Sequence, residues 1–424
     1  MIPTTPDAFL KKYPVDPRIA QALLVQGEMC SKRSPLIAEI QDGEHQAAVE
    51  EALSNGANVN EVDGNGNTPL NLAVLRRNVA LINLLLKNGA NVDLVDGHGL
   101  SPLNIAVTRG QKDRLQTLFR ANANVNIKNH TGQTPLHQAA EIPYEDVMKR
   151  MIKELLKKGA DIEAQDNNGL TPLHMACTTL PFAPAIKVLV KAKANVNAQD
   201  KEGVTPLFRC AFKAHEMRVD NWELKGEIAG EPVEYHIERG QFSFTRDGKK
   251  EKIPARSIRH LCQSYCHEHF MYLDALEGVK ALIKAGADVN LAANNGTSPV
   301  HILCLVGDVP TIKSLVKAKA DFNTPGRFLV PPVSHVAQSG NLGALKIVLK
   351  TGIEIDAESE DGVTALHEAA LRGYADVVKF LVKSGASQKT KSKVASGPYP
   401  KGATPSDVAR IAGFFSIEGF LNKQ

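Results

Sequence analysis

Apolar residues along this chain fall into two alternating kinds of short segment. One kind is a run of about five residues with a Leu and a pair of small side chains, as in residues 136–140 (LHQAA). The other kind is longer, and its apolar residues recur at three-to-four spacing, as in residues 377–382 (VVKFLV). Such spacing predicts an amphipathic helix. The pattern therefore predicts pairs of short helices, and one pair alone cannot cover its own apolar face.

A fragment close to Thr-Pro-Leu-His stands at the start of the first segment of each pair. It begins at residues 68, 101, 134, 171, 205, 298, 331, 364 and 404, so the steps are 33, 33, 37, 34, 93, 33, 33 and 40 residues. Thr or Ser before Pro predicts a helix start, because the hydroxyl caps free backbone N–H groups and Pro loses no hydrogen bond at the first helical position. A Gly such as Gly159 or Gly385 ends the second helix, where a positive φ costs little.

A second fragment, Gly-Ala-x-Val-Asn, recurs in fixed phase with the first, as in residues 56–60. A period of 33 residues with this signature is typical of ankyrin repeats, and the chain from Ser34 to Leu421 resembles an ankyrin-repeat protein. The resemblance implies an all-α repeat solenoid with a β-turn and two antiparallel helices in each unit. It also implies that His at the fourth position of the fragment ties neighbouring turns together by hydrogen bonds. We therefore assign no metal or catalytic role to His137, His174, His301 and His367.

The phase of the repeats predicts the organisation of the chain. Residues 1–33 form a flanking segment with a helix from about Pro17 to Glu28, and residues 34–424 form about ten repeat units including both caps. The last cap begins at Thr404. The loop before it, residues 388–401, is seven residues longer than usual and contains four lysines, so we expect a mobile, solvated surface loop.

The step of 93 residues predicts an insert. The excess, residues 216–273, lies between the two helices of the repeat at 205–297, and insertions in repeat proteins often form a binding face. Alternation around Arg239-Gly240 and the turn at Asp247-Gly248 predicts a small antiparallel meander. Helical spacing from Ile258 onward predicts that the second helix of the repeat is lengthened at its N-terminal end.

Aromatic residues are concentrated in and around this insert, with eight of the chain's 22 between Phe212 and Tyr272. One interpretation is a small core that attaches the insert to the stack, since aromatic residues dominate small cores. The other is an exposed recognition surface that includes Trp222, Phe242 and Phe244.

Composition limits the classes of function. The net charge of +4 is too small to indicate nucleic-acid binding, and no stretch has the roughly 18 consecutive apolar residues of a membrane span. The first residues lack the features of a signal peptide, so we expect a soluble, cytoplasmic monomer. The six cysteines form no disulfide framework, and repeat phase predicts that Cys177, Cys210 and Cys304 are buried thiols in small-residue positions.

Candidate chemistry is confined to one cluster in the insert. Cys262, Cys266 and His269 lie at i, i+4 and i+7 of a helix and are weak candidates for a zinc site, but the spacing matches no common zinc motif. Phosphate-binding loops and the common hydrolase and kinase motifs are absent. We therefore expect no cofactor and no enzymatic activity, with a metal- or Cys-dependent enzyme in the insert as the minor alternative.

The resemblance implies that a protein partner binds the concave face, through fingertip residues and residues that follow the small pair of each first helix. Basic residues dominate the helix positions, which favours an acidic partner surface. The rewritten finger at residues 325–330 is predicted to expose Arg327 and Phe328. The other candidates are Arg76, His98, Arg109, His130, Asn168, Thr179, Glu202 and Lys213.

One modification pattern is also present. Asn126, Asn197 and Asn290 each follow Val and lie eight residues after a Leu, which resembles the ankyrin substrate pattern of an animal asparaginyl hydroxylase. The alternative is that these asparagines serve turn geometry.

These observations predict a non-enzymatic protein–protein interaction module that uses the concave face and the insert. Irregular repeats with an odd insert favour an effector that an intracellular bacterium secretes into the host cytoplasm or nucleus. The alternative is an endogenous cytosolic scaffold or adaptor.

Overall fold

The computed structural model describes residues 35–42, 46–178, 182–218, 222–228, 231–238, 241–246, 249–252, 267–395 and 397–423. It divides into two compact units. Unit 1 extends to Asn167, and unit 2 comprises residues 168–424 together with the short stretch 143–145. The helix expected at residues 17–28 lies outside the described residues.

The described residues of unit 1 form four helix pairs. In each pair we call the first helix inner and the second outer. Inner helices contact inner helices of the next pair, and α6 contacts α8 in the outer row. The inner helices are α3 (Pro35–Asp42), α5 (Pro69–Leu75), α7 (Pro102–Thr108) and α9 (Pro135–Ala140), and the outer helices are α4 (Gln46–Ser54), α6 (Val79–Lys87), α8 (Lys112–Arg120) and α10 (Glu145–Lys157).

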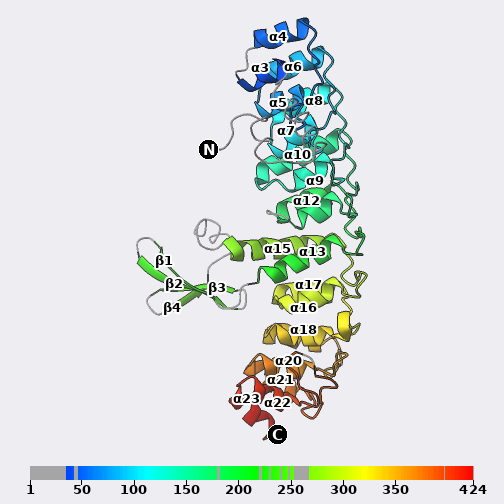
Figure 1. Ribbon diagram of the computed structural model, residues 1–424. Coiled ribbons are helices and arrows are strands. Elements are labelled where there is room, and N and C mark those ends of the chain that lie inside the picture. The colour runs from blue at the N-terminus through cyan, green and yellow to red at the C-terminus, as the bar shows by residue number, and fades with distance from the viewer. Residues whose placement is uncertain are drawn as a thin grey trace, which may run out of the picture. The chain divides into compact units, whose positions relative to one another are not determined.

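The described residues of unit 2 form six further pairs (Figure 1). Each inner helix contacts the next inner helix, and the first five outer helices contact one another in order. The inner helices are α11 (Pro172–Ala176), α13 (Pro206–Glu216), α16 (Pro299–Val306), α18 (Pro332–Gln338), α20 (Ala365–Leu371) and α22 (Pro405–Ile411). The outer helices are α12 (Phe182–Lys191), α15 (His267–Lys284), α17 (Val309–Lys317), α19 (Leu342–Leu349), α21 (Ala375–Lys383) and α23 (Phe415–Leu421).

The Thr-Pro-Leu-His fragment begins the inner helices as predicted. The Thr205 hydroxyl oxygen accepts the N–H of Phe208 at 3.2 Å. In α11, the N–H of Thr171 donates to Nδ1 of His174 at 3.1 Å. Because Nδ1 accepts this bond, Nε2 carries the proton, and it donates to the carbonyl oxygen of Val204 in the next repeat at 3.0 Å.

Two further histidines bridge repeats in the same way. Nε2 of His301 bonds to the carbonyl of Thr324 at 3.0 Å, and Nε2 of His367 bonds to the carbonyl of Ala403 at 3.1 Å. The inter-turn role that the resemblance implies is confirmed for these histidines. The cysteine prediction is confirmed as well, because Cys177, Cys210 and Cys304 are free and fully buried.

The insert contains a four-stranded antiparallel sheet. Its strands are adjacent in chain order, and two-residue connections separate Glu238 from Gln241 and Arg246 from Lys249. Both connections coincide with the turn positions indicated by the sequence, whereas the pattern did not indicate the first strand. The strands are β1 (Trp222–Ile228), β2 (Glu231–Glu238), β3 (Gln241–Arg246) and β4 (Lys249–Lys252).

Helix α15 follows the sheet and has 18 residues, twice the 9 residues of α17. It packs against α13, and both helices are labelled in Figure 1. The part of the expected extension before His267 lies outside the described residues.

Two residues of the loop at residues 388–401 are buried against neighbouring repeats, so the loop is not wholly solvated as the sequence predicted, and its mobility stays a prediction. Ser392 is buried, its N–H donates to the carbonyl of Ala403 at 3.0 Å, and its hydroxyl oxygen accepts the N–H of Ala403. Tyr399 is buried in a cluster with Val363 and Val408. Tyr399 thus joins the core of the last two pairs, while the four lysines of the loop remain on the surface.

Candidate functional site

The loops that join successive pairs form turns, which we call fingers, and most of them are built around a carboxylate or amide. In the finger before α13, Oδ1 of Asp200 accepts the N–H groups of Glu202 and Val204, both at 2.9 Å. Gly203 lies at the tip with φ +74°, which costs little without a Cβ. Asp200 also pairs with Arg209 at 2.6 Å.

Successive fingers are joined by backbone hydrogen bonds. The N–H of Lys201 donates to the carbonyl of Asn168 at 3.1 Å, and the N–H of Asn294 donates to the carbonyl of Glu202 at 2.9 Å. In unit 1, the N–H of Gly97 donates to the carbonyl of Asn65 at 3.2 Å. These bonds therefore fix the position of each finger relative to the next, and the fingertips form a row within each unit.

The finger at residues 325–330 departs from this design. By repeat phase, Gly326 stands where Asp200 stands in the ordinary finger, so the anchoring carboxylate is missing. Residues Arg327–Leu329 form a short 3₁₀ turn, η1, in which Phe328 and Leu329 have φ of 56° and 55°. Leu329 takes the position that Gly203 holds elsewhere. A left-handed conformation costs a non-Gly residue about 1–2 kcal/mol.

Contacts on both sides hold this strained turn. The N–H of Gly326 donates to the carbonyl of Val330 at 3.0 Å, and the carbonyl of Phe328 accepts the N–H of Glu360 in the next finger at 3.1 Å. A Cβ on Gly326 would lie 2.6 Å from Cδ2 of His301, so only Gly fits against the imidazole. Strain retained in this way is characteristic of functional segments.

The turn presents apolar side chains to solvent. Phe328 is 61% exposed and Leu329 is 54% exposed. The Arg327 guanidinium lies 4.6 Å from the centre of the Phe328 ring, a cation–π distance. Sequence reasoning predicted Arg327 and Phe328 but missed Leu329, although a Leu in the place of the fingertip Gly is a readable signal.

Comparison with known families decides the class of the protein. A profile of ankyrin repeats in three copies matches residues 81–152, 144–218 and 330–392, and a profile of ankyrin repeats in many copies matches residues 53–106. The chain belongs to the ankyrin-repeat family. Ankyrin repeats are protein–protein interaction modules, and proteins built from them are typically non-enzymatic.

One solved structure is similar to part of the chain. The chain is similar to the crystal structure of the ankyrin repeat domain of Bcl-3, described as a unique member of the IκB protein family, at 21% identity and a TM-score of 0.44. The similarity covers 64% of this chain and 93% of that one. Curated proteins provide no match. Among the described residues, no helix is both long and apolar enough to cross a membrane.

Other predicted contact residues lie on the exposed parts of the ankyrin fingers and inner-helix ends. Arg76 donates to the carbonyl of Gln41, and Lys213 forms an ion pair with Glu216 at 2.7 Å. The positive charge of Lys213 is therefore partly neutralised within the protein. Thr179 lies outside the described residues. The exposed residues of this set are Arg76, His98, Arg109, His130, Asn168 and Glu202.

The insert residues are placed only by backbone. Trp222 of β1 and Phe242 of β3 both pair with Ile237 of β2, and Phe244 pairs with Tyr235. Their side chains lie outside the description, as do Cys262, Cys266 and the side chain of His269. Within the described residues, no group of three or more His, Cys, Asp or Glu residues is arranged to hold a metal ion.

The three asparagines of the hydroxylation pattern bridge successive ankyrin repeats. Oδ1 of Asn126 accepts the N–H of Asp161 at 2.7 Å, Oδ1 of Asn197 accepts that of Asp288 at 2.7 Å, and Oδ1 of Asn290 accepts that of Asp321 at 2.8 Å. Asn60 makes the same bond to Asn91 without the preceding Leu of the pattern. The bridging role therefore explains the asparagines by itself, and hydroxylation stays a prediction.

Proposed function

We propose that this ankyrin protein binds a protein partner through the finger at residues 325–330. The observation that carries the proposal is the strained turn that exposes Phe328 and Leu329 beside Arg327. Aromatic and Arg side chains dominate the energy of protein interfaces. Exposing two apolar side chains on a strained backbone lowers the stability of the free protein. Burial of these side chains against a partner would offset this loss.

The finger is held in one conformation before any partner binds. Its backbone is tied to the next finger by the bond between Phe328 and Glu360, and its base rests on His301. Binding of a partner to the finger therefore costs little conformational entropy, because the finger is already ordered. Neighbouring fingertip residues such as Glu202 and Asn295 extend the same row and would supply polar contacts around the apolar centre.

The Leu329→Gly variant separates binding from stability. Glycine adopts φ of 55° at little cost, so the free energy of unfolding should stay equal or rise by up to about 1 kcal/mol. Capture of the partner from source-cell extract should fall at least severalfold, because an apolar contact is removed.

The matched control is Phe415→Ser, which removes a side chain that is 68% exposed on the C-terminal cap. Urea denaturation and quantitative mass spectrometry of co-purifying proteins provide the two measurements. Reduced stability together with unchanged capture would contradict the proposed role of the finger.

We also propose that the insert, residues 216–273, provides an auxiliary contact. The pairing of Trp222, Ile237 and Phe242 across three strands supports this, because aligned positions lie on one face of a sheet. Replacing residues 219–266 by a short Gly-Ser turn keeps Arg218, whose guanidinium bonds to the carbonyls of Leu305 and Ser339.

This shortened protein is expected to stay folded and to bind its partner more weakly, as checked by circular dichroism and the same capture experiment. Undiminished capture would exclude the auxiliary contact. Aggregation would instead favour the small-core interpretation of the aromatic residues.

Two biological settings fit a binding module of this kind. The split repeat and the rewritten finger support a secreted bacterial effector that acts in host cytoplasm or nucleus, and a cytosolic scaffold is the alternative. The origin of the captured partner distinguishes them, because an effector binds a host protein and a scaffold binds a protein of its own cell.

A further inference from the structure

Five of the six outer helices described in unit 2 carry lysines in pairs one helical turn apart, at or near the C-terminus of the helix. Residues at i and i+4 share one face of a helix, so each pair forms one rung of a row, which we call the lysine ladder. The pairs are Lys187 and Lys191 at α12, Lys280 and Lys284 at α15, Lys313 and Lys317 at α17, Lys346 and Lys350 at α19, and Lys379 and Lys383 at α21.

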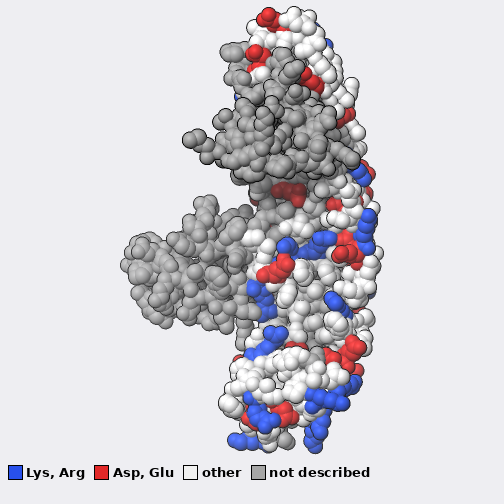
Figure 2. Space-filling view, viewed as in Figure 1, with Lys and Arg blue, Asp and Glu red and all other residues white. Residues whose placement is uncertain are grey.

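Most of this charge is not neutralised within the described part of the chain. Lys280 is half-buried and the other nine lysines are exposed. Acidic partners there are Glu277 for Lys187 and Asp308 for Lys280, the latter at 3.9 Å. Figure 2 shows Lys and Arg side chains along unit 2 on the face that it draws, with Asp and Glu side chains between them.

The ladder is unfavourable for the helices that carry it. Like charges at i and i+4 destabilise a helix, whereas Glu four residues before Lys stabilises it. The second lysine of each rung complements the negative end of the helix dipole, but this does not explain the first. A costly pair at all five of these outer helices indicates an external anionic ligand.

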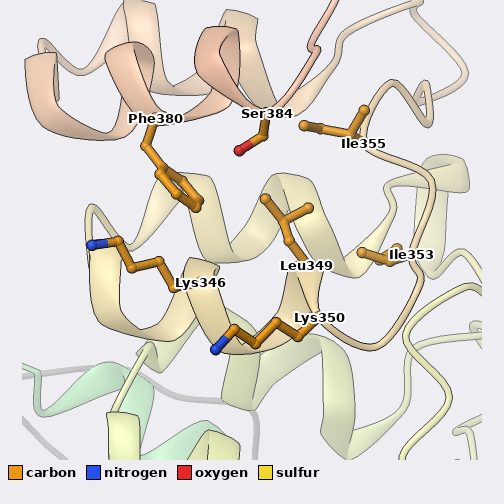
Figure 3. Close-up of a pocket in the computed structure, with 7 residues that line it drawn as sticks. All are labelled: Lys346, Leu349, Lys350, Ile353, Ile355, Phe380 and Ser384. Atoms are coloured by element: carbon orange, nitrogen blue, oxygen red, sulfur yellow. The ribbon is translucent and has the colours of Figure 1, made fainter.

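One rung borders a cavity of about 500 Å³ between α19 and α21. Its apolar lining consists of Leu349, Ile353, Ile355 and Phe380, and Ser384 completes it with the two lysines of the rung. Figure 3 shows Phe380 projecting from α21 toward α19, with Lys346 and Lys350 on the α19 side. The Lys346 ammonium lies 5.4 Å from the centre of the Phe380 ring.

This arrangement suits an apolar group next to a carboxylate. The cavity has the size of a small-ligand site, which typically measures about 300–1,000 Å³. No acidic residue lines it. A nucleic acid backbone could satisfy the lysines but offers no aliphatic side chain for Leu349 and Ile353, so a peptide satisfies both features better.

We propose that the lysine ladder binds an extended acidic segment of a partner protein, with one of its apolar side chains in the cavity at Phe380. Packed helices lie about 8–10 Å apart, and an extended chain advances about 3.3 Å per residue. A carboxylate at every third residue therefore meets successive rungs. This surface goes beyond the finger at residues 325–330 and does not depend on it.

A synthetic peptide tests the proposal with the full-length protein. The probe is a fluorescein-labelled peptide of about 15 residues, with Asp at every third position, Ser and Thr between, and one central Leu. Two comparison peptides carry the same aspartates in a single block, or Ser in place of the central Leu. Fluorescence anisotropy should show the tightest binding for the probe, and high salt should weaken it because exposed charges are screened.

Two double variants with the same loss of charge locate the site. Lys346→Gln with Lys350→Gln should weaken probe binding roughly 2- to 30-fold, as expected for two exposed ion pairs. Lys389→Gln with Lys391→Gln, on the loop before the last pair, should change it less than about twofold. The Leu329→Gly variant should bind the probe like the unaltered protein. The proposal for the finger at residues 325–330 and the proposal for the lysine ladder can therefore fail independently.

Equal weakening by both double variants would overturn the proposal, because it would show attraction by net charge alone. Equal affinity for the probe and for the peptide with its aspartates in a single block would contradict the match between aspartate spacing and helix spacing. Tighter binding of single-stranded DNA or of anionic phosphatidylserine vesicles than of the probe would replace the peptide by another class of ligand.

Discussion

Truncation of Leu136 or Leu173 to Ala is expected to lower the free energy of unfolding by about 2–5 kcal/mol. Leu136 in α9 and Leu173 in α11 occupy the same position of the repeat fragment, and their side chains are 0% and 1% exposed. Removing three carbons leaves a cavity that the surrounding helices close only in part. Because each repeat is stabilised by its neighbours, the loss should extend to adjacent pairs.

Urea denaturation followed by circular dichroism measures this effect. Val62→Ala is a suitable control, since Val62 is 57% exposed and surface truncations usually change stability by less than about 0.5 kcal/mol. A free energy of unfolding that changes by no more than in the control for both Leu variants would show that these residues are not core positions.

Acidification is expected to destabilise the protein between about pH 6.5 and pH 4. Burial lowers the pKa of His174 and of His335 to about 4, and it also lowers the pKa of His301 and His367. The unfolded chain has histidine pKa values near 6.5, so it binds more protons than the folded chain in this window. The contribution of the buried neutral histidines to stability is therefore fully present above pH 6.5 and is lost as the pH falls.

At pH 5 the loss should reach about 2 kcal/mol for each histidine whose pKa is near 4. The chain itself supplies the matched variant, because Asn71 stands at the same position and donates Nδ2–H to the carbonyl of Leu100 at 3.3 Å. His174→Asn should keep the bridge to Val204 while reducing the dependence of the urea midpoint on pH. An unchanged pH dependence in this variant would contradict the assignment.

The regular part of the fold was predictable because local chemistry repeats. The Thr-Pro start caps its own helix, and the His or Asn at the fourth position bonds to the next repeat in His174, His301 and Asn71 among others. A short fragment therefore encodes both the helix and its contact with the neighbouring repeat. The finger at residues 325–330 was predictable for the opposite reason, because its sequence departs from the pattern of the other fingers. The exposure of Leu329 follows from the same departure.

Contacts between residues distant in sequence could not be predicted in this way. Arg218 bonds to the carbonyls of Leu305 and Ser339, which are 87 and 121 residues away. Ser392 and Tyr399 fold a loop that reads as polar onto the last two pairs. The cavity at Phe380 likewise needs two helices from different repeats, and no single fragment specifies how their side chains meet.

Photo-crosslinking from position 328 tests most directly whether the finger is the binding surface. A photoreactive phenylalanine analogue replaces Phe328 in the full-length protein, and the same analogue at Phe415, a similarly exposed position, serves as the control. The predicted result is a discrete crosslinked protein from position 328 that is absent from position 415 and lost when Leu329→Gly is added. Identical crosslinks from both positions, or none from position 328, would contradict the finger as the site of partner binding.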